Sequence, residues 1–259
     1  MLFRSPGTIT KPFKTISKAS SVAKPGNTIV IGGGTYEETI KPNRSGTAGS
    51  PIIYTSKQGE KVIISAMQAL SGWRKDKGAI YKVKVNWDLG QENFIMNGST
   101  AMDLARWPNN TDGKPFTLNS LRNDGGSNKN IVNGAYLTSS KIPGINWKGG
   151  SVFFYGDKPG AGWIAWKAFI TSSSSGRVNF KLDKSPSWIR TFHAPADKGD
   201  FYLEGVKGAL DYQNEWWFDS ATKEFFVQLP GGAAPKNGLV QMRKRKIAID
   251  LNNRSYIHI

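Results

Sequence analysis

Two segments near the start of the chain decide the fold: TIVIGGGTYEETIKPN at 28–43 and PIIYTSKQGEKVII at 51–64. Each contains short runs of β-branched residues that end at turns rich in glycine, proline or polar residues, a pattern that is typical of short strands. Ile29 and Ile52 lie 23 residues apart. This spacing suits parallel strands stacked in successive coils, about 4.8 Å apart. A β-sandwich would also give short strands, so the spacing leaves both architectures open.

The segment ahead of these strands predicts an α-helix. Thr10 can cap it, Pro12 suits its first turn, and KPG at 24–26 ends it. An amphipathic helix laid across the open end of a stack of coils would cap that stack. We expect Ile29, Ile52 and Ile249 to share one continuous column of strands.

The character of the sequence changes between residues 71 and 238. Strand candidates there are longer, alternate more clearly and carry most of the aromatic residues, which predicts an antiparallel β module. We therefore expect a cap helix and first coils at 1–70, the inserted module at 71–238, and a return to coils at 239–259. The last strand, at 255–259, ends the sequence without a cap. This indicates either a fragment of a longer protein, which we favour, or an open end covered by self-association.

Composition excludes several classes of protein. The 259 residues are 38% hydrophobic and include no run approaching the roughly 18 apolar residues of a membrane helix. The absence of cysteine excludes disulfides, a cysteine nucleophile and cysteine-ligated metals, and two histidines exclude a histidine-rich metal centre. The first residues lack the apolar core of a signal peptide.

The charge balance is strongly basic, with 35 basic and 19 acidic residues and a net charge of +16. This excess favours polyanionic partners such as anionic polysaccharide, although a lysine-rich soluble surface explains it as well. One tight basic cluster exists, RKRK at 243–246, and it falls within an expected strand. Nucleic acid is therefore a minor hypothesis.

Three groups of motifs carry a resemblance to a known family. GTITKPFKTI at 7–16, KPGNTI at 24–29 and GTYEE at 34–38 resemble the opening of right-handed parallel β-helix proteins that act on polysaccharides. NG at 97–98 with LARWPN at 104–109, and the stretch 210–230 around EWWFD, resemble motifs of the same pectate-lyase-like superfamily. The superfamily includes pectate, alginate and chondroitin lyases and β-helix glycoside hydrolases.

The resemblance implies an all-β fold: the start of a right-handed parallel β-helix with an N-terminal capping helix and an inserted antiparallel β-sandwich-like module. It also implies that the helix resumes near Leu239 and that catalytic residues lie on later coils, absent from this chain. Because lyases, hydrolases and binding modules share such folds, the resemblance does not select an activity.

Carboxylates are the first candidates for glycosidase chemistry, which needs an acid and a base or nucleophile about 5–10 Å apart. Asp211, Glu215 and Asp219 form the densest set flanked by aromatic residues and are weak catalytic candidates. At a spacing of four in a strand and turn, we expect them to cap turns and pair with lysines instead of converging. For Glu37 and Glu38, after the turn at 34–36, a structural role is favoured.

Arg106 and Trp107 are candidates for binding a sugar acid, because a guanidinium pairs with a carboxylate while an indole stacks on a sugar ring. The competing account, which we favour, is that Arg106 is tied to a backbone carbonyl. Three further tryptophans are binding candidates. Trp147 and Trp188 lie in glycine- or proline-flanked segments expected to be exposed, and Trp217 should face away from its neighbour Trp216.

The sequence thus predicts the polysaccharide-binding N-terminal part of an extracellular or periplasmic β-helix protein, with little or no catalysis of its own. The basic excess favours anionic glycans. An intact glycoside hydrolase or polysaccharide lyase is the first alternative, and a structural module that associates end to end through 255–259 is the second. No cofactor is expected, because calcium has no supporting motif, and neither nucleic acid nor membrane is a favoured partner.

Overall fold

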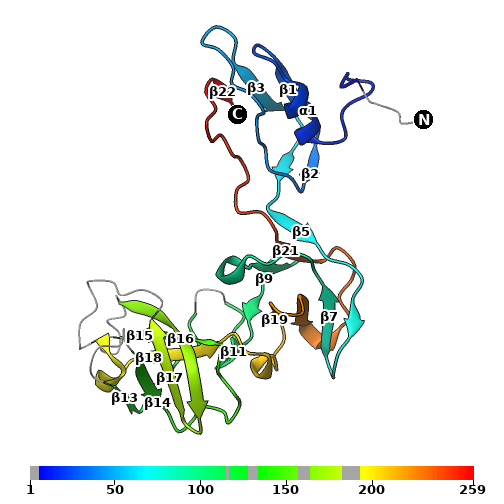
Figure 1. Cartoon of the computed structure of the whole chain (residues 1–259). Coiled ribbons are helices and arrows are strands. Elements are labelled where there is room, and N and C mark those ends of the chain that lie inside the picture. The colour runs from blue at the N-terminus through cyan, green and yellow to red at the C-terminus, as the bar shows by residue number, and fades with distance from the viewer. Residues whose placement is uncertain (1–5, 115–116, 128–133, 157–163, 183–192) are drawn as a thin grey trace. The chain divides into compact units, whose positions relative to one another are not determined.

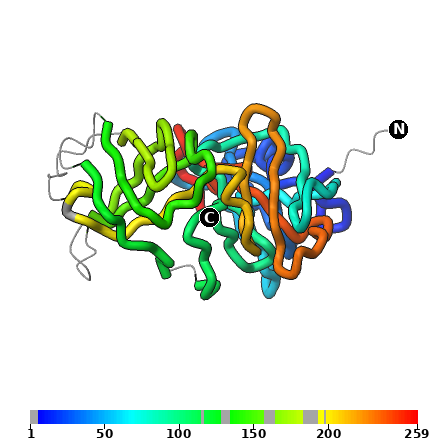
Figure 2. The backbone as a smooth tube through the Cα atoms, turned by 90° about the horizontal axis from the view of Figure 1, so that it is seen from below, coloured from blue at the N-terminus to red at the C-terminus, as the bar shows by residue number. Residues whose placement is uncertain are grey.

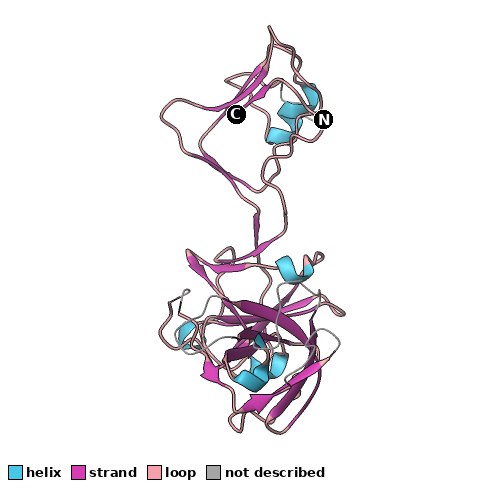
Figure 3. Ribbon diagram, turned by 90° about the vertical axis from the view of Figure 1, so that its left-hand side faces the viewer, coloured by secondary structure: helices cyan, strands magenta, loops and turns pink. Residues whose placement is uncertain are grey.

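The computed structural model describes residues 6–114, 117–127, 134–156, 164–182 and 193–259. Strands and the loops between them make up nearly all of this part of the chain (Figure 3). The all-β class predicted from the sequence is confirmed. The helices are α1 (Ile16–Val22) and the short 3-10 turns η1 (Gly90–Glu92), η3 (Pro195–Asp197), η4 (Lys207–Ala209) and η5 (Pro230–Gly232).

The chain divides into two compact units. The first contains Met1–Ala69, Trp87–Phe94 and Gln241–Ile259, and the second contains Leu70–Asn86 and Ile95–Val240. The segment Trp87–Phe94 lies in the first unit, although the sequence suggests that it belongs to the module at 71–238. The backbone therefore passes from one unit to the other four times.

The first unit is built from parallel strands that lie side by side in Figure 1. In the sheet β1-β3-β22, Ile29 pairs with Tyr54 and Ile52 pairs with Ile257. The strands β2 and β4 also pair in parallel. The strands of this unit are β1 (Thr28–Ile31), β2 (Gly34–Tyr36), β3 (Ile52–Ser56), β4 (Val62–Ile64), β5 (Met67–Ala69), β22 (Ile257–His258) and, from Gln241 onward, β21 (Val240–Arg243), which pairs antiparallel with β5.

One expected column of strands needs a correction. Ile29 and Ile52 lie in the same parallel sheet, but Ile249 forms a parallel bridge with Ile40 outside that sheet. The late segment thus returns alongside the early part of the chain at two places, one near residue 249 and one at β22. The core of this unit consists of Ile16, Ala23, Ile31, Ile40, Ile52 and Tyr54.

The helix α1 begins later than the sequence suggests. Thr15, not Thr10, is its N-cap and accepts a hydrogen bond from the backbone of Lys18 at 3.1 Å. Glu38 accepts hydrogen bonds from the backbone N–H groups of Ile16 (3.1 Å) and Ser17 (2.9 Å), which satisfies donors that the first helical turn leaves free. Burial of Glu38 opposes ionisation, but the bonds from Ser17 and Ile16 outweigh it and lower its pKa. The structural role expected for Glu38 is confirmed.

The second unit contains, within the described residues, two sheets and a hairpin. The strand order is β10-β19-β20-β7-β6 in the five-stranded sheet and β11-β18-β15-β16-β17-β14-β13 in the larger one, where β12 also pairs with β18. All neighbours in these two sheets are antiparallel except β10 and β19. The hairpin of β19 and β20 is orange in Figure 2.

The strands of the five-stranded sheet are β6 (Arg74–Lys75), β7 (Ile80–Lys84), β10 (Asp103–Leu104), β19 (Glu215–Asp219) and β20 (Glu224–Gln228). Those of the larger sheet are β11 (Arg106–Trp107), β12 (Leu121–Arg122), β13 (Gly125–Gly126), β14 (Ala135–Thr138), β15 (Ser151–Tyr155), β16 (Ala165–Ser174), β17 (Arg177–Leu182) and β18 (Asp200–Glu204). The separate hairpin, which is distinct from the β19–β20 pair, consists of β8 (Ile95–Asn97) and β9 (Thr100–Ala101).

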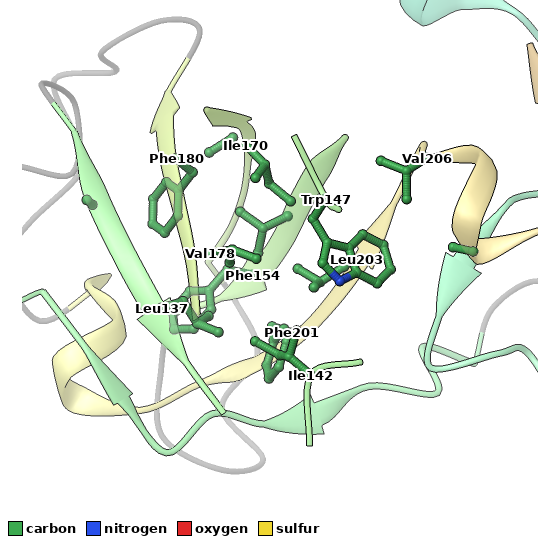
Figure 4. Packing of buried hydrophobic residues seen from close by; sticks show 14 of the residues in the cluster. Leu137, Ile142, Trp147, Phe154, Ile170, Val178, Phe180, Phe201, Leu203 and Val206 are labelled. Carbon is green, nitrogen blue, oxygen red and sulfur yellow. The ribbon is translucent and has the colours of Figure 1, made fainter. Parts of the chain in front are cut away.

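The core of the second unit lies on one face of the larger sheet (Figure 4). Alternate residues of its strands point into this core, as the period of two in a strand requires. Phe154, Leu137, Phe201 and Leu203 are fully buried there together with Trp147. Among the described residues, no helix has both the length and the apolar character to cross a membrane.

Candidate functional site

The candidate site is built around the segment Asp103–Trp107, which passes from one sheet of the second unit to the other. Asp103 pairs with Glu215 of β19, and Arg106 pairs with Glu204 of β18. Ala105, between them, is fully buried and its backbone N–H donates to the carbonyl of Trp216 at 2.8 Å. Pairing on both sides fixes the direction in which the chain enters the loop that begins at Pro108.

The guanidinium of Arg106 is committed to backbone carbonyls. Its Nε donates to Pro108 O at 2.9 Å, and Nη2 donates to the carbonyl oxygens of Leu118 and Asn119. Its central carbon lies 4.0 Å from the ring centre of Tyr202, and the residue is buried. These contacts agree with the account that the sequence favours, in which Arg106 is tied to a backbone carbonyl, and the candidate pairing with a sugar carboxylate is corrected because the donors are already used at Pro108, Leu118 and Asn119.

Glu215 holds the backbone of Arg106 and that of Tyr212. Its Oε1 accepts a hydrogen bond from the backbone N–H of Arg106 at 3.2 Å, and Oε2 accepts one from Tyr212 at 3.4 Å. Burial, opposed by the N–H of Arg106 and aided by the nearby charge of Asp211, raises the pKa of Glu215 to about 8. The side chain carries a proton at neutral pH and is 1% exposed, so it does not reach a surface ligand.

Asp219 and Asp211 take separate roles. Asp219, at the far end of β19, accepts hydrogen bonds from the backbone of Ala221 (2.9 Å) and Thr222 (3.2 Å) and so caps the hairpin turn. Asp211 is exposed and accepts a bond from Nδ2 of Asn109 at 3.1 Å. The three predicted carboxylates therefore do not form an accessible acid and base pair, since one is sealed and another caps a turn.

A group of polar side chains around the loop was not anticipated from the sequence. Asn110 donates to Asp103 Oδ2 at 3.0 Å, and Asn119 donates to Asn110 Oδ1 at 3.0 Å and to Asp112 Oδ1 at 3.3 Å. The sequence run that could have indicated this group is PNNTD at 108–112, but such a run is also typical of a polar linker. We call this group the amide cluster; its members are Asp103, Asn109, Asn110, Asp112, Asn119 and Asp211.

The tryptophans near the cluster differ in their exposure. Trp107 is half-buried, with its ring 6.1 Å from that of Phe201, and Trp217 is half-buried with its indole N–H donating to Gly205 O at 3.1 Å. Both keep part of their surface open. Trp107 is the one that adjoins the amide cluster in sequence.

Trp147 is not an exposed platform. It is fully buried in the core of the second unit, where its backbone N–H donates to Ser173 Oγ at 2.9 Å and its indole N–H to Pro143 O at 3.3 Å. The predicted sugar contact for Trp147 is therefore wrong, since a ligand cannot reach its ring. Trp188, the other predicted platform, lies outside the described residues.

The basic cluster at 243–246 is used within the first unit. Arg245 donates to the carbonyls of Ser65 (3.4 Å) and Met67 (2.9 Å), and Lys246 pairs with Glu92 at 3.0 Å. Lys244 lies over the ring of Trp87 at 4.9 Å. This cluster is therefore a set of structural contacts. In the described part of the chain, no group of three His, Asp or Glu side chains is arranged to hold a metal ion.

Comparison with known proteins gives partial matches. Residues 4–43 match the family described as "Protein of unknown function (DUF1565)". Over 99 residues the chain is 44% identical to the uncharacterized protein YwoF of Bacillus subtilis, covering 38% of this chain and 20% of that protein. Over 60 residues it is 43% identical to pectate lyase PEL9 of Emericella nidulans, covering 22% of this chain and 15% of that protein.

A solved structure titled "Glycoside hydrolase" matches 98% of this chain with a TM-score of 0.66 at 18% identity. The match covers 47% of that chain, so the present chain spans less than half of it. The chain spans a fifth or less of the two curated relatives. The chain thus shares the fold of part of a larger all-β protein.

Proposed function

We propose that the chain is the polysaccharide-binding N-terminal part of a larger, exported carbohydrate-active protein of right-handed parallel β-helix architecture. The parallel pairing of β1, β3 and β22 and the fold match to a glycoside hydrolase support this architecture. The likeness to a pectate lyase over 60 residues supports a glycan as the partner. An extracellular or periplasmic location follows from such a partner.

The observation that carries the proposal is the amide cluster, whose loop directly follows the half-buried Trp107 in sequence. Amide and carboxylate groups hydrogen-bond sugar hydroxyls, and an indole stacks on the C–H face of a sugar ring. The cluster is held in place by Arg106 and Glu215, whose own polar groups face the backbone. We assign binding to the cluster and Trp107, and little or no catalysis to these residues.

A panel of insoluble polysaccharides tests this function by pull-down of the whole chain. Asp211→Ala removes the acceptor of Asn109 and should reduce retention several-fold, whereas Asp219→Asn, which can still cap its turn, should not. If both variants are retained as well as the unmodified chain, the amide cluster is not part of the binding site. Release of reducing ends or of unsaturated uronates from the same panel would instead favour the alternative of an intact hydrolase or lyase.

Apolar exposure favours a second candidate function, end-to-end association. Tyr256 is 52% exposed and Ile259 is 59% exposed, and β22 is an edge strand of its sheet. Such an edge can pair with another strand, from the same protein or a second copy. A mass that rises with concentration in light scattering, and falls with Ile259→Lys, would support association between copies.

A further inference from the structure

The larger sheet of the second unit has a second face, opposite its core, with an unusual composition. Phe153 and Tyr155 alternate along β15 with the fully buried Val152 and Phe154, so they point away from the core and are half-buried. Tyr202 does the same on β18 and stands directly opposite Phe153. We call this surface the outer face; its described positions on β15, β16 and β18 are Ser151, Phe153, Tyr155, Ala165, Lys167, Phe169, Asp200, Tyr202 and Glu204.

The aromatic rings of the outer face form a contiguous row. Phe153 and Tyr202 are nearly parallel, with an angle of 7° between rings and 5.1 Å between ring centres. The ring of Tyr155 follows at 5.3 Å from that of Phe153. The solvated face of an antiparallel sheet is normally polar, and a connected apolar patch on it marks a binding surface.

The charges around the row favour an anionic ligand. Both carboxylates of the face have cationic partners: Glu204 binds Lys167 at 2.7 Å, and Asp200 lies 3.5 Å from Arg122. Lys181 lies on β17, where it pairs with Phe169 of β16. Its side chain is exposed and adds a further positive charge. No leucine, isoleucine or valine stands among the nine described outer-face positions. Flat rings bordered by cations suit a carboxylated sugar chain better than the aliphatic core of a protein interface.

We propose that the outer face is a second glycan site, specific for a uronate-containing polysaccharide. The sugar rings stack on Phe153 and Tyr155, and the exposed Lys181 pairs with a carboxylate of the sugar chain, whereas Lys167 neutralises Glu204. This inference rests on the proposed polysaccharide-binding function, but it assigns a different surface from the amide cluster. Arg106 marks the end of the row, because its guanidinium already covers the ring of Tyr202.

The test is the affinity of the whole chain for polygalacturonate, measured by affinity electrophoresis alongside its methyl-esterified, uncharged counterpart. Phe153→Thr and Tyr155→Thr, which introduce a β-branched residue that also favours the strand, should each weaken binding about tenfold. Tyr136→Thr is the matched control, since Tyr136 lies on the same face but on β14, which β17 separates from β16, and the guanidinium of Arg177 covers its ring at 3.7 Å. It should bind as the unmodified chain does.

Lys181→Ala keeps the test informative if an aromatic variant fails to fold, because this side chain is exposed. It should weaken binding of the acidic polymer and leave the esterified polymer unaffected. Equal affinity of the unmodified chain for both polymers would overturn the uronate assignment.

Normal binding by folded Phe153→Thr and Tyr155→Thr, with loss in Asp211→Ala, would overturn the outer face and leave the proposed function standing. If the unmodified chain binds no polysaccharide of the panel, the proposed function falls and the outer-face site falls with it.

Discussion

Replacing Glu215 with glutamine should stabilise the second unit at neutral and alkaline pH. The folded protein holds the proton of Glu215 up to a pKa of about 8, whereas the unfolded chain releases it near the ordinary value of 4.5. Between these values the unfolded state binds fewer protons, so rising pH lowers the free energy of unfolding by about 1.4 kcal/mol per unit. At pH 7 this loss amounts to about 3 kcal/mol.

Glutamine has no proton to release in this range, and its Oε1 can still accept the N–H of Arg106. The advantage of Glu215→Gln should therefore be small at pH 5, reach about 3 kcal/mol at pH 7 and level off above pH 8. Urea unfolding followed by tryptophan fluorescence measures it, because eight of the nine tryptophans lie in residues 70–86 and 95–240 and report on the second unit.

Glu224→Gln is a control of opposite sign. The hydrogen bond from Lys82 and that from Arg74 lower the pKa of Glu224, so its contribution to stability is present at neutral pH and lost as pH falls through the folded pKa. The free energy of unfolding of Glu215→Gln is compared with that of the unmodified protein. If the difference stays constant from pH 5 to pH 8, Glu215 does not hold a buried proton, and its description as a buried, protonated acceptor of the Arg106 N–H is refuted.

Three further changes test the packing. Trp147→Ala should destabilise the second unit by about 3–5 kcal/mol in the same urea assay, because it leaves a cavity at a fully buried site. A loss below about 1 kcal/mol would mean that Trp147 is not buried in the core. Glu38→Ala should cost about 1 kcal/mol through the start of α1, seen as lower helical circular dichroism on heating; unchanged melting would contradict the capping role. Gly46→Ala should disrupt the first unit, because its Cβ would lie 2.5 Å from Tyr256 O, and proteolysis of β22 should then accelerate; unchanged resistance would mean that the backbone can shift there.

Local pattern predicted the strands well and their ends less well. Residues 28–31, 151–155 and 177–182 form strands, because β-branched and aromatic runs there end at strong turns. The start of α1 was misplaced because two threonines can cap it. The choice depends on Glu38, which lies 22 residues from Ile16 in sequence and binds its N–H. Such a contact is not visible in a local window.

The candidate site shows the same limit. The glycines near Trp147 suggested an exposed segment, but Gly150 is required because a Cβ there would lie 2.5 Å from Glu204 O. Gly150 thus marks a close approach of two backbones and not an exposed turn. The amide cluster joins residues 103 and 211 only after β10 and β19 have paired, so no spacing in the sequence announced it.

The pairing of Ile52 with Ile257 joins strands that are 205 residues apart in sequence. On the ribosome, β1 and β3 emerge early, but the third member of their sheet leaves the tunnel only after the whole of Leu70–Val240 has been made. Since domains generally fold as they are synthesised, the second unit can complete its sheets while one edge of β3 in the first unit is still unpaired. The part of the protein that is translated first is thus the last to be finished, and during that interval β3 is the strand most in need of protection from aggregation.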